Sequence, residues 1–295
     1  MSCVDYAGQS VNTTPELNLI FSAATFSLPH PDSVNEKVKT GEVIFNWGGV
    51  KIARISPDVV VKFGPHVTVT EAKSMIFVGQ NARTVPVPEV FACYSYGPID
   101  RDVDDYGSLF DTYIFMSFVE GQTLDTVWGS YDEATKHHVA DQLKECLHDL
   151  RNISGGTYIG SIDRGPVTDQ ILTGSLNKGP FDSEESFNNT LIDVYQANAP
   201  KRHVRSLLTG MLSQNKHRTV FTHGDLRLQN IMVKSGRITG ILDWEFSGWY
   251  PEYWEFSKAL YVWKWQNDWI DYLMDILQPY YSEYLIHSFL SEPVW

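Results

Sequence analysis

The chain of 295 residues has few cysteines and no long apolar run. Cys3, Cys93 and Cys146 are its three cysteines and lie far apart, which argues against a disulfide framework or a zinc site and indicates a reducing, cytoplasmic setting. No segment has about eighteen consecutive apolar residues, so no membrane span is expected. The apolar stretch 17–28 follows Glu16 and no basic residue, which argues against a secretory signal.

Positive charge is also scarce. The chain has 23 Lys and Arg against 36 Asp and Glu, which gives a formal net charge of −13. Binding to a phosphate backbone requires a basic surface, so no nucleic-acid partner is expected. The hydrophobic content of 43% is enough for a globular protein with a sizeable core, and the length fits one large domain or two lobes.

The most informative residues lie between His223 and Glu245. They begin His-Gly-Asp-Leu-Arg-Leu-Gln-Asn and end Ile-Leu-Asp-Trp-Glu. Between these ends, two short apolar runs flank a polar turn at 234–237, which predicts a β-hairpin. Such a hairpin would bring Asn230 close to Asp243.

Three side chains of this segment suit metal-assisted phosphoryl transfer. Asp225 can accept the proton of an attacking hydroxyl, while Asn230 and Asp243 can hold Mg²⁺ against nucleotide phosphates. Oxygen ligands without a nearby Cys or His cluster favour Mg²⁺ over zinc. Alone, Asp225 could simply cap a turn and Asp243 could end a strand, but the ordered set is much rarer. His223 is expected to brace the loop and to take no part in the chemistry.

This segment resembles the aminoglycoside phosphotransferase and choline kinase superfamily, and most closely the fungal phosphotransferase enzyme family. The resemblance continues through Gly-Trp-Tyr-Pro-Glu-Tyr-Trp-Glu at 248–255 and covers about residues 42–265. It implies an α+β, two-lobed protein-kinase-like fold. Residues 1–116 would form a leader and a β-rich nucleotide-binding lobe, residues 117–121 a hinge, and residues 122–295 a mainly helical lobe with the catalytic loop and acceptor site.

Local patterns agree with that plan. Residues 43–63 alternate or are β-branched between two turns and predict a three-stranded meander. A helix is expected over about 71–80. A longer one is expected over 131–151, where Ser130 and Glu133 have the spacing of a capping box and Val139, Leu143, Leu147 and Leu150 fall on one apolar face. The first forty residues show little periodicity and are expected to form an arm or a loosely packed leader.

The resemblance also assigns nucleotide-binding residues. Lys62 would contact the α- and β-phosphates and pair with Glu71 on the next helix, although Glu71 could instead cap its own helix with Thr68. Gly48 and Gly49 would form a turn over the phosphates, but most such pairs only make turns.

The segment 116–121 matches the family hinge. The backbone of Ser117 and Val119 would bind the adenine edge, and Met116 would pack behind the base. A buried strand end followed by a glycine turn fits the spacing nearly as well.

Arg227, Glu245 and Trp249 are candidates for the acceptor site. Arg227 stands where many relatives have His-Pro; it could stabilise the transferred phosphoryl group or bind a surface carboxylate. No Phe-Gly follows Asp243 and no long activation segment follows, so a small molecule is favoured over a protein substrate. Further aromatic candidates, which could equally be helix packing, are Tyr253, Trp254, Tyr261, Trp263, Trp265 and Trp269.

The function implied is an ATP- and Mg²⁺-dependent O-phosphotransferase acting on a hydroxyl of a small molecule. An aminoglycoside, a secondary metabolite or an amino alcohol would fit. Two alternatives stay open, because a fold does not fix a function. One is a nucleotide-binding pseudoenzyme, and the other is a kinase-like fold recruited for different biosynthetic chemistry.

Overall fold

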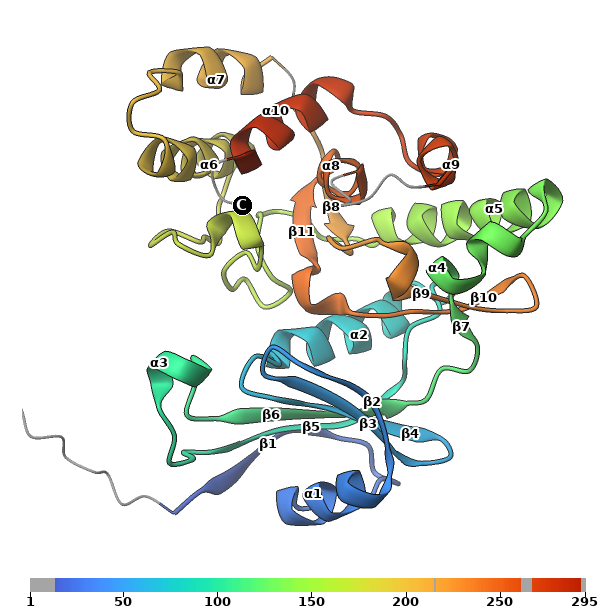
Figure 1. The fold of residues 1–295 in the computed structure, drawn as a ribbon. Coiled ribbons are helices and arrows are strands. Elements are labelled where there is room, and N and C mark those ends of the chain that lie inside the picture. Colours follow the sequence, from blue (N-terminus) through green and yellow to red (C-terminus); the bar gives the residue numbers. More distant parts are fainter. Residues whose placement is uncertain (1–13, 215, 261–266, 293–295) are drawn as a thin grey trace, which may run out of the picture. The chain divides into compact units, whose positions relative to one another are not determined.

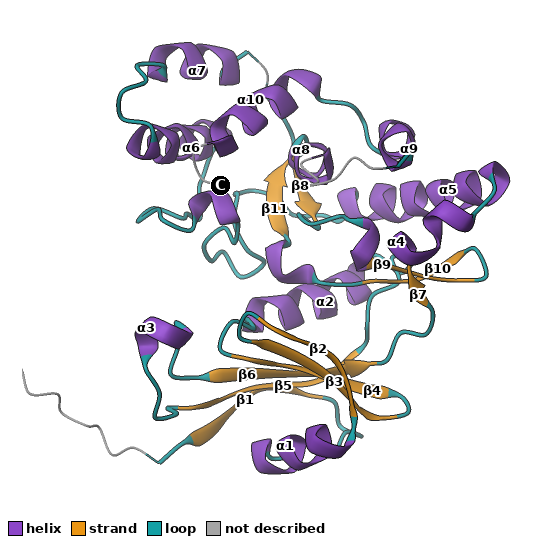
Figure 2. Cartoon of the chain, viewed as in Figure 1, coloured by secondary structure: helices purple, strands orange, loops and turns teal. Residues whose placement is uncertain are grey.

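A computed structural model of the protein describes residues 14–214, 216–260 and 267–292. The expected acceptor residues Tyr261, Trp263 and Trp265 lie outside these residues. The chain divides into two compact units: one ends at Val69 and resumes over 91–116, and the other comprises 70–90 and the chain from Ser117 onward. Strands dominate the first unit and helices the second (Figure 2). The α+β class and the N-terminal sheet are therefore confirmed.

The first unit is built on a six-stranded sheet with strand order β1-β5-β6-β4-β3-β2. The pairs β1–β5, β2–β3 and β3–β4 are antiparallel, and helix α1 packs on the sheet (Figure 1). The predicted meander is thus confirmed as β2–β4. The elements of this unit are β1 (Glu16–Ser22), α1 (Pro31–Thr40), β2 (Glu42–Trp47), β3 (Val50–Ser56), β4 (Val59–Gly64), β5 (Val90–Gly97), α3 (Val103–Tyr106) and β6 (Asp111–Ser117).

A two-residue turn joins β2 to β3. Trp47 pairs with Val50 across it, and Gly48 and Gly49 have φ of 60° and 75°. Two consecutive left-handed residues form the hairpin turn whose twist matches that of the strands, and glycine adopts this conformation without steric cost.

The prediction of a loosely packed leader is wrong for residues 16–40. Strand β1 pairs with β5 along its length, and Val34 on α1 is fully buried in the core of the sheet. The Tyr94 hydroxyl donates to the carbonyl of Pro29 at 3.0 Å. Apolar residues here occur in short blocks without a clean period, so the sequence pattern did not reveal that they pack on a distant strand.

The second unit combines helices with two small sheets, of order β10-β9-β7 and β11-β8. Helix α5 packs against α9, β8 and β10, and α10 packs against α6, α7 and α8. None of the described helices is long and apolar enough to cross a bilayer. The elements are α2 (Val69–Asn81), β7 (Gln122–Thr123), α4 (Leu124–Val127), α5 (Glu133–Arg151), α6 (Glu184–Asn198), α7 (Arg205–Leu212), β8 (Thr219–Thr222), β9 (Ile231–Lys234), β10 (Arg237–Ile241), β11 (Gly248–Pro251), α8 (Trp254–Leu260), α9 (Trp269–Ile276) and α10 (Tyr281–Ser291).

The start of α5 corrects one prediction. Asp132 is the N-cap and accepts the N–H of Thr135 at 2.8 Å. Ser130 instead ends a short 3₁₀ helix, and its hydroxyl donates to the carbonyl of Val127 at 2.7 Å. Serine and aspartate are both favoured N-cap residues, so residue type alone does not distinguish Ser130 from Asp132. Ser130 belongs to the 3₁₀ helix that precedes α5, and Asp132 is the cap. The expected apolar face is confirmed by the burial of Val139, Leu143, Leu147 and Leu150.

Candidate functional site

The hairpin that carries the candidate metal ligands is present. Strand β9 pairs with β10 from Lys234–Arg237 to Ile231–Ile241. Beyond the paired strands, the N–H of Leu242 donates to the carbonyl of Asn230 at 2.8 Å. Asn230 precedes β9 and Asp243 follows Leu242, so the predicted hairpin is confirmed and places these two residues at the same end.

Asn230 is bonded directly to Asp225. Its amide nitrogen donates to the Asp225 Oδ2 at 2.9 Å and to the Asp225 carbonyl at 2.8 Å. Asn230 is buried, whereas the side chain of Asp225 is 19% exposed. The two bonds fix the amide group, so its oxygen is the end that can ligate a cation.

Arg227 makes an ion pair with the candidate base. Its Nη2 lies 2.6 Å from the Asp225 Oδ2, and 47% of its side chain is exposed. The sequence analysis allowed Arg227 to bind an unidentified carboxylate, and in the structure that carboxylate belongs to Asp225. A guanidinium this close makes a charge-assisted contact with the carboxylate and adds a positive charge beside the candidate chemistry.

His223 braces the loop from within. Its Nε2 donates to the carbonyl of Leu242 at 2.9 Å, and its Nδ1 accepts the N–H of Asp225 at 3.2 Å. One nitrogen donates and the other accepts, which is the pattern of a neutral ring. The buried ring also contacts the indole of Trp244. His223 thus ties the loop of Asp225 to the strand end before Asp243, as expected of a structural residue.

Asp243 has a left-handed backbone, with φ of 65° and ψ of 64°. This conformation costs a non-glycine residue about 1–2 kcal/mol, although aspartate tolerates it better than most residues. A short 3₁₀ helix, Trp244–Phe246, begins directly afterwards and includes the half-buried Glu245. Backbone strain at a side chain with candidate ligand chemistry is typical of functional sites.

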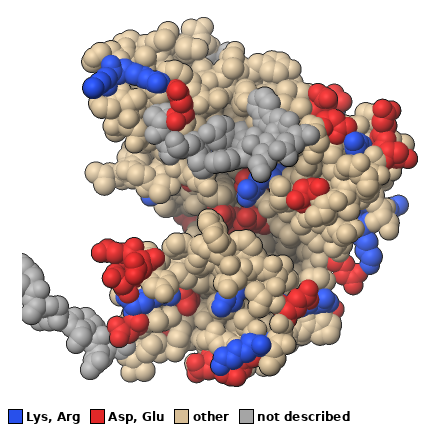
Figure 3. Space-filling model, in the orientation of Figure 1, with Lys and Arg blue, Asp and Glu red and all other residues tan. Residues whose placement is uncertain are grey.

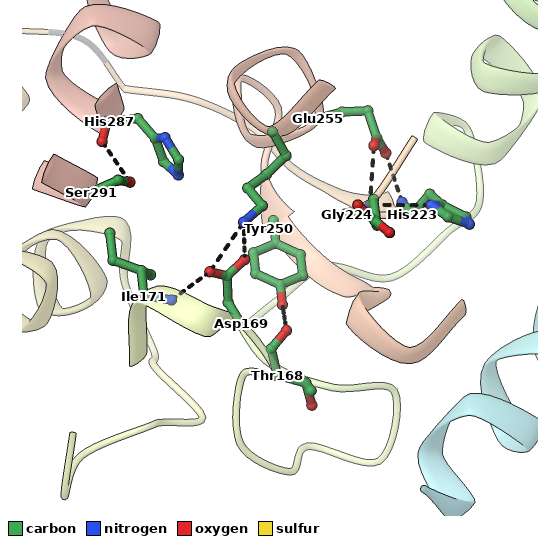
Figure 4. A network of polar contacts seen from close by, with 11 residues as sticks. Thr168, Asp169, Ile171, His223, Gly224, Tyr250, Glu255, His287 and Ser291 are labelled. Atoms are coloured by element: carbon green, nitrogen blue, oxygen red, sulfur yellow. Dashed lines mark hydrogen bonds and ion pairs between the residues drawn. The ribbon is translucent and has the colours of Figure 1, made fainter. Parts of the chain in front are cut away.

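Glu255 is a residue of this site that the sequence analysis missed. Its carboxylate accepts the N–H of His223 at 2.7 Å and that of Gly224 at 3.2 Å, as Figure 4 shows. Glu255 is only 2% exposed, so helix α8 presents a buried carboxyl group to the start of the loop that carries Asp225. The sequence carried one signal for it: an acidic residue lies within the aromatic run Tyr-Trp-Glu-Phe. Burial of a carboxylate among aromatic side chains is costly unless the carboxylate is hydrogen-bonded.

Helix α8 holds a second segment through Lys258. The Lys258 Nζ lies 3.0 Å from the Asp169 Oδ2, and Asp169 Oδ1 accepts the N–H of Ile171 at 3.0 Å. The Tyr250 hydroxyl donates to the carbonyl of Thr168, and burial, with Asp169 nearby, raises the pKa of Tyr250 well above its usual value. The irregular segment 168–171 is therefore anchored to α8 and β11 (Figure 4).

Trp249 lies in the core of the second unit. It is 3% exposed, its ring contacts the rings of Phe77 and Phe221, and it covers Gly155, where a β-carbon would come within 2.4 Å of the indole. This packing favours the structural role that the sequence also allowed. The aromatic candidates Tyr253, Trp254 and Trp269 are likewise buried.

The candidate nucleotide residues of the first unit are Lys62, Gly48, Gly49 and Met116. Lys62 is 5% exposed on β4 and pairs with Ile52 of β3. The glycines form the turn between β2 and β3, and Met116 is buried near the end of β6.

Glu71, Ser117 and Val119 belong to the second unit. Glu71 is buried in the first turn of α2. The N–H of Ser117 donates to the carbonyl of Glu89 at 2.9 Å, and the Ser117 hydroxyl accepts the N–H of Glu89 at 2.9 Å. Val119 packs against Gly240, where a β-carbon would come within 2.7 Å of it.

Within the described parts of the chain, no group of three or more His, Cys, Asp or Glu side chains could hold a metal ion alone. The candidate ligands are instead one amide and one carboxylate. Mg²⁺ in nucleotide enzymes typically takes one or two protein ligands and completes its shell with phosphates and water. The residues present fit a metal that arrives with a nucleotide.

Comparison with known proteins agrees with this geometry. Residues 53–286 match the family model described as the phosphotransferase enzyme family. The chain belongs to that family. It is 28% identical over 122 residues to the aminoglycoside 3′-phosphotransferase of Enterococcus faecalis, and the match covers 40% of this chain and 42% of that protein. The chain thus spans less than half the length of the curated relative it matches.

Solved structures share the fold. The gentamicin complex of aminoglycoside phosphotransferase APH(2″)-IIa superposes with a TM-score of 0.55 at 13% identity, covering 90% of this chain and 87% of that one. The ADP-bound aminoglycoside phosphotransferase APH(2″)-Ib gives a TM-score of 0.55 at 13% identity, covering 88% and 84%. At such low identity these likenesses establish the fold alone, and the predicted kinase-like fold is confirmed.

Proposed function

We propose that the protein is an ATP- and Mg²⁺-dependent phosphotransferase that phosphorylates a hydroxyl of a small molecule. The observation that carries this proposal is the hairpin that groups a carboxylate base with an amide and a second carboxylate, Asp225, Asn230 and Asp243. Membership of the phosphotransferase enzyme family supports it. Similar structures with ADP or gentamicin bound agree with a nucleotide and a hydroxylated acceptor.

Asp225 is the proposed base. Arg227 and Asn230 both bind its Oδ2, so we assign Oδ1 to the acceptor hydroxyl. The hydroxyl oxygen forms a bond to the γ-phosphorus, the bond to the bridging oxygen breaks and releases ADP, and the hydroxyl proton passes to Asp225. Arg227 is close enough to place its charge beside the transferred group.

Asn230 and Asp243 are the proposed Mg²⁺ ligands. The amide of Asn230 is fixed by Asp225, and the left-handed backbone of Asp243 sets the direction in which its carboxylate leaves the strand. When bound, the cation would neutralise charge on the phosphates. Both ligands are held by the hairpin and the His223–Leu242 bond rather than by the metal.

The remaining predicted residues complete the proposal. The first lobe would bind the nucleotide with Gly48, Gly49 and Lys62, residues 117–121 would be the hinge, and residues 122–295 would form the catalytic lobe. Glu71, Met116, Ser117 and Val119 are assigned to the nucleotide, and Arg227 and Glu245 to the acceptor side. The acceptor would be an aminoglycoside, a secondary metabolite or an amino alcohol, and the setting cytoplasmic.

Calorimetric titration with ATP, with and without Mg²⁺, tests the proposal. Asp243→Ala should abolish the Mg²⁺-dependent part of binding, whereas Asp141→Ala, at an exposed position on α5, should leave it intact. A panel of hydroxylated acceptors is then screened by mass spectrometry for the gain of one phosphoryl group. Binding of ATP without any such gain would favour a pseudoenzyme, and no binding under either condition would contradict the proposal.

A further inference from the structure

His66, in the loop between β4 and α2, joins two turns of the first unit. Its Nδ1 lies 2.7 Å from the carbonyl oxygen of Gly48 in the β2–β3 turn. Its Nε2 lies 3.0 Å from the carbonyl oxygen of Tyr106 at the end of α3. The two partners are 18 and 40 positions away in the sequence, so a single exposed ring connects three separate segments.

The two contacts can form together in only one protonation state of the His66 ring. A carbonyl oxygen only accepts hydrogen bonds, so each ring nitrogen of His66 must donate. A neutral imidazole has one N–H, whereas the imidazolium has two. Only the charged ring can therefore hold Gly48 and Tyr106 together, and deprotonation breaks one of the two bonds.

Two glycines make room for the ring. A β-carbon on Gly49 would come within 3.1 Å of the His66 Nδ1, and one on Gly107 within 3.3 Å of its Nε2. Both glycines have left-handed φ, 75° and 71°. The ring thus lies between two tight turns, and the glycine in each turn leaves room for it. This indicates that the contact is specific to the fold.

The β2–β3 turn is held by the pairing of β2 with β3, which reaches Trp47 and Val50 at its edge. Every residue of β2 is exposed, including the large side chains of Val43, Phe45 and Trp47. Burial therefore contributes little to the position of the turn. The hydrogen bond from His66 to the Gly48 carbonyl adds a link between the turn and the β4–α2 loop that the hairpin alone does not provide.

We propose that His66 is a positioning residue that, in its charged form, fixes the glycine turn for the nucleotide phosphates. The inference rests on the proposed function, because it assigns that turn to the nucleotide. Because only the ring with two N–H groups makes both contacts, ATP binding is expected to weaken when the ring loses one of its protons at higher pH.

Other charged groups lie on the elements that meet at His66. Acidic side chains gather over α3 (Figure 3). Lys51 of β3 lies over the ring of Phe63, and Arg101 pairs with Asp111 at 2.8 Å. The charged or titratable side chains on β2, β3, β4, α2 and the segment 101–106 are Glu42, Lys51, Arg54, Lys62, Glu71, Lys73, Arg101, Asp102, Asp104, Asp105 and Tyr106. All of them remain in the variants proposed below, so any pH dependence that they cause also remains.

The test compares ATP·Mg²⁺ affinity at pH 6.0 and pH 8.5 in the full chain. The natural protein should bind about 3- to 10-fold more weakly at pH 8.5, the effect of one ordinary hydrogen bond. His66→Gln, which donates without titrating, and His66→Ala should both lose that pH dependence. His138→Gln, at an exposed position on α5, should keep it. Persistence of the full pH dependence in both His66 variants would overturn the inference.

Hydrogen exchange of the Gly49 and Val50 amides separates this inference from the proposed function. Exchange rates, corrected for the intrinsic effect of pH, should rise between pH 6.0 and 8.5 in the natural protein and be raised at both pH values in His66→Ala. This readout needs no nucleotide. If ATP does not bind at all but the exchange pattern is seen, the proposed function fails while the His66 contact stands; if exchange is unchanged by His66→Ala, the contact fails.

Discussion

The catalytic loop and the glycine turn, both proposed to serve one reaction, are held in opposite ways. The loop at 223–230 is buried at His223, Gly224 and Asn230 and is fixed by hydrogen bonds from several elements, among them Glu255 of α8. The turn at Gly48 and Gly49 is exposed and follows a strand without a buried residue. Beyond the pairing of β2 with β3, it is linked to the β4–α2 loop by the contact with His66.

The difference follows from what each segment must do. A base and metal ligands must hold their geometry through the reaction, and buried hydrogen-bonded side chains provide that rigidity. A segment that covers phosphates must also let the nucleotide enter and leave, and segments of low local stability serve such roles. Changes in the catalytic loop should therefore affect turnover and stability, whereas changes at the turn should affect nucleotide affinity.

The largest expected effect is that of Asp225→Asn. The substitution keeps the shape of the side chain and removes the proton acceptor, so turnover should fall by about 10²- to 10⁴-fold. ATP affinity should change little. Steady-state kinetics with the acceptor found by screening gives the first value and calorimetry the second. An equal loss in Asp141→Asn, at an exposed position on α5, would show that the assay does not report on the base.

Glu255→Gln tests whether α8 positions the catalytic loop. The amide offers one acceptor oxygen in place of two, and it leaves a buried N–H of His223 or Gly224 without its partner. The free energy of unfolding should fall by about 1–3 kcal/mol. Urea unfolding measures this, with Glu145→Gln on the exposed face of α5 as the matched control. Turnover should fall as well while ATP affinity is kept; unchanged turnover would leave Glu255 a purely structural role.

Local signals in the sequence were sufficient to predict the hairpin of Asn230 and Asp243. Two short apolar runs around a Lys-Ser-Gly-Arg turn predict two adjacent strands, and adjacency brings their ends together. The meander at 43–63 and the apolar face of α5 follow from the same local periodicity. These elements needed no knowledge of distant partners.

Glu255 and His66 could not be found in this way. Each acts through groups far along the chain: Glu255 through backbone N–H groups 31 and 32 positions away, and His66 through carbonyls 18 and 40 positions away. Backbone partners leave no residue-type signature in a sequence. The packing of Trp249 against Phe77 and Phe221 also joins distant segments and could not be predicted from local sequence.

Arg227→Gln separates an effect on turnover from an effect on stability within the loop at 223–230. Arg227 is half exposed, unlike the other side chains that bind the loop, so its loss should leave stability nearly unchanged. Turnover should fall about tenfold, less than the ~10²-fold or more typical of a buried transition-state donor. Affinity for ATP should stay within about twofold, a small change by the usual scale of 1.4 kcal/mol per factor of ten. Steady-state kinetics and urea unfolding of the same preparation separate the two effects; a loss of stability without a loss of turnover would assign Arg227 to the fold.

The smallest expected effect lies at His217, outside the catalytic loop. His217 bonds Glu184 of α6 at 2.8 Å and faces Glu283 of α10 at 3.5 Å. Burial alone lowers the pKa of His217, but the hydrogen bond to Glu184 and the nearby charges of Glu184, Glu283 and Glu252 raise it above its ordinary value of 6.5. The folded state therefore holds the proton more tightly than the unfolded state.

The sign of the pH effect follows. The stabilisation from His217 should be fully present below about pH 6.5 and lost as pH rises through the raised folded pKa. His217→Gln should thus lower the free energy of unfolding by about 1 kcal/mol at pH 6.0 and by less at pH 8.5, measured by urea unfolding. His287 has the opposite shift, since burial lowers its pKa to about 3, so its contribution is lost as pH falls and does not mimic the trend. A difference between the natural protein and His217→Gln that grows toward pH 8.5 would contradict the assignment, because a charged histidine between two carboxylates stabilises the fold only while it keeps its proton.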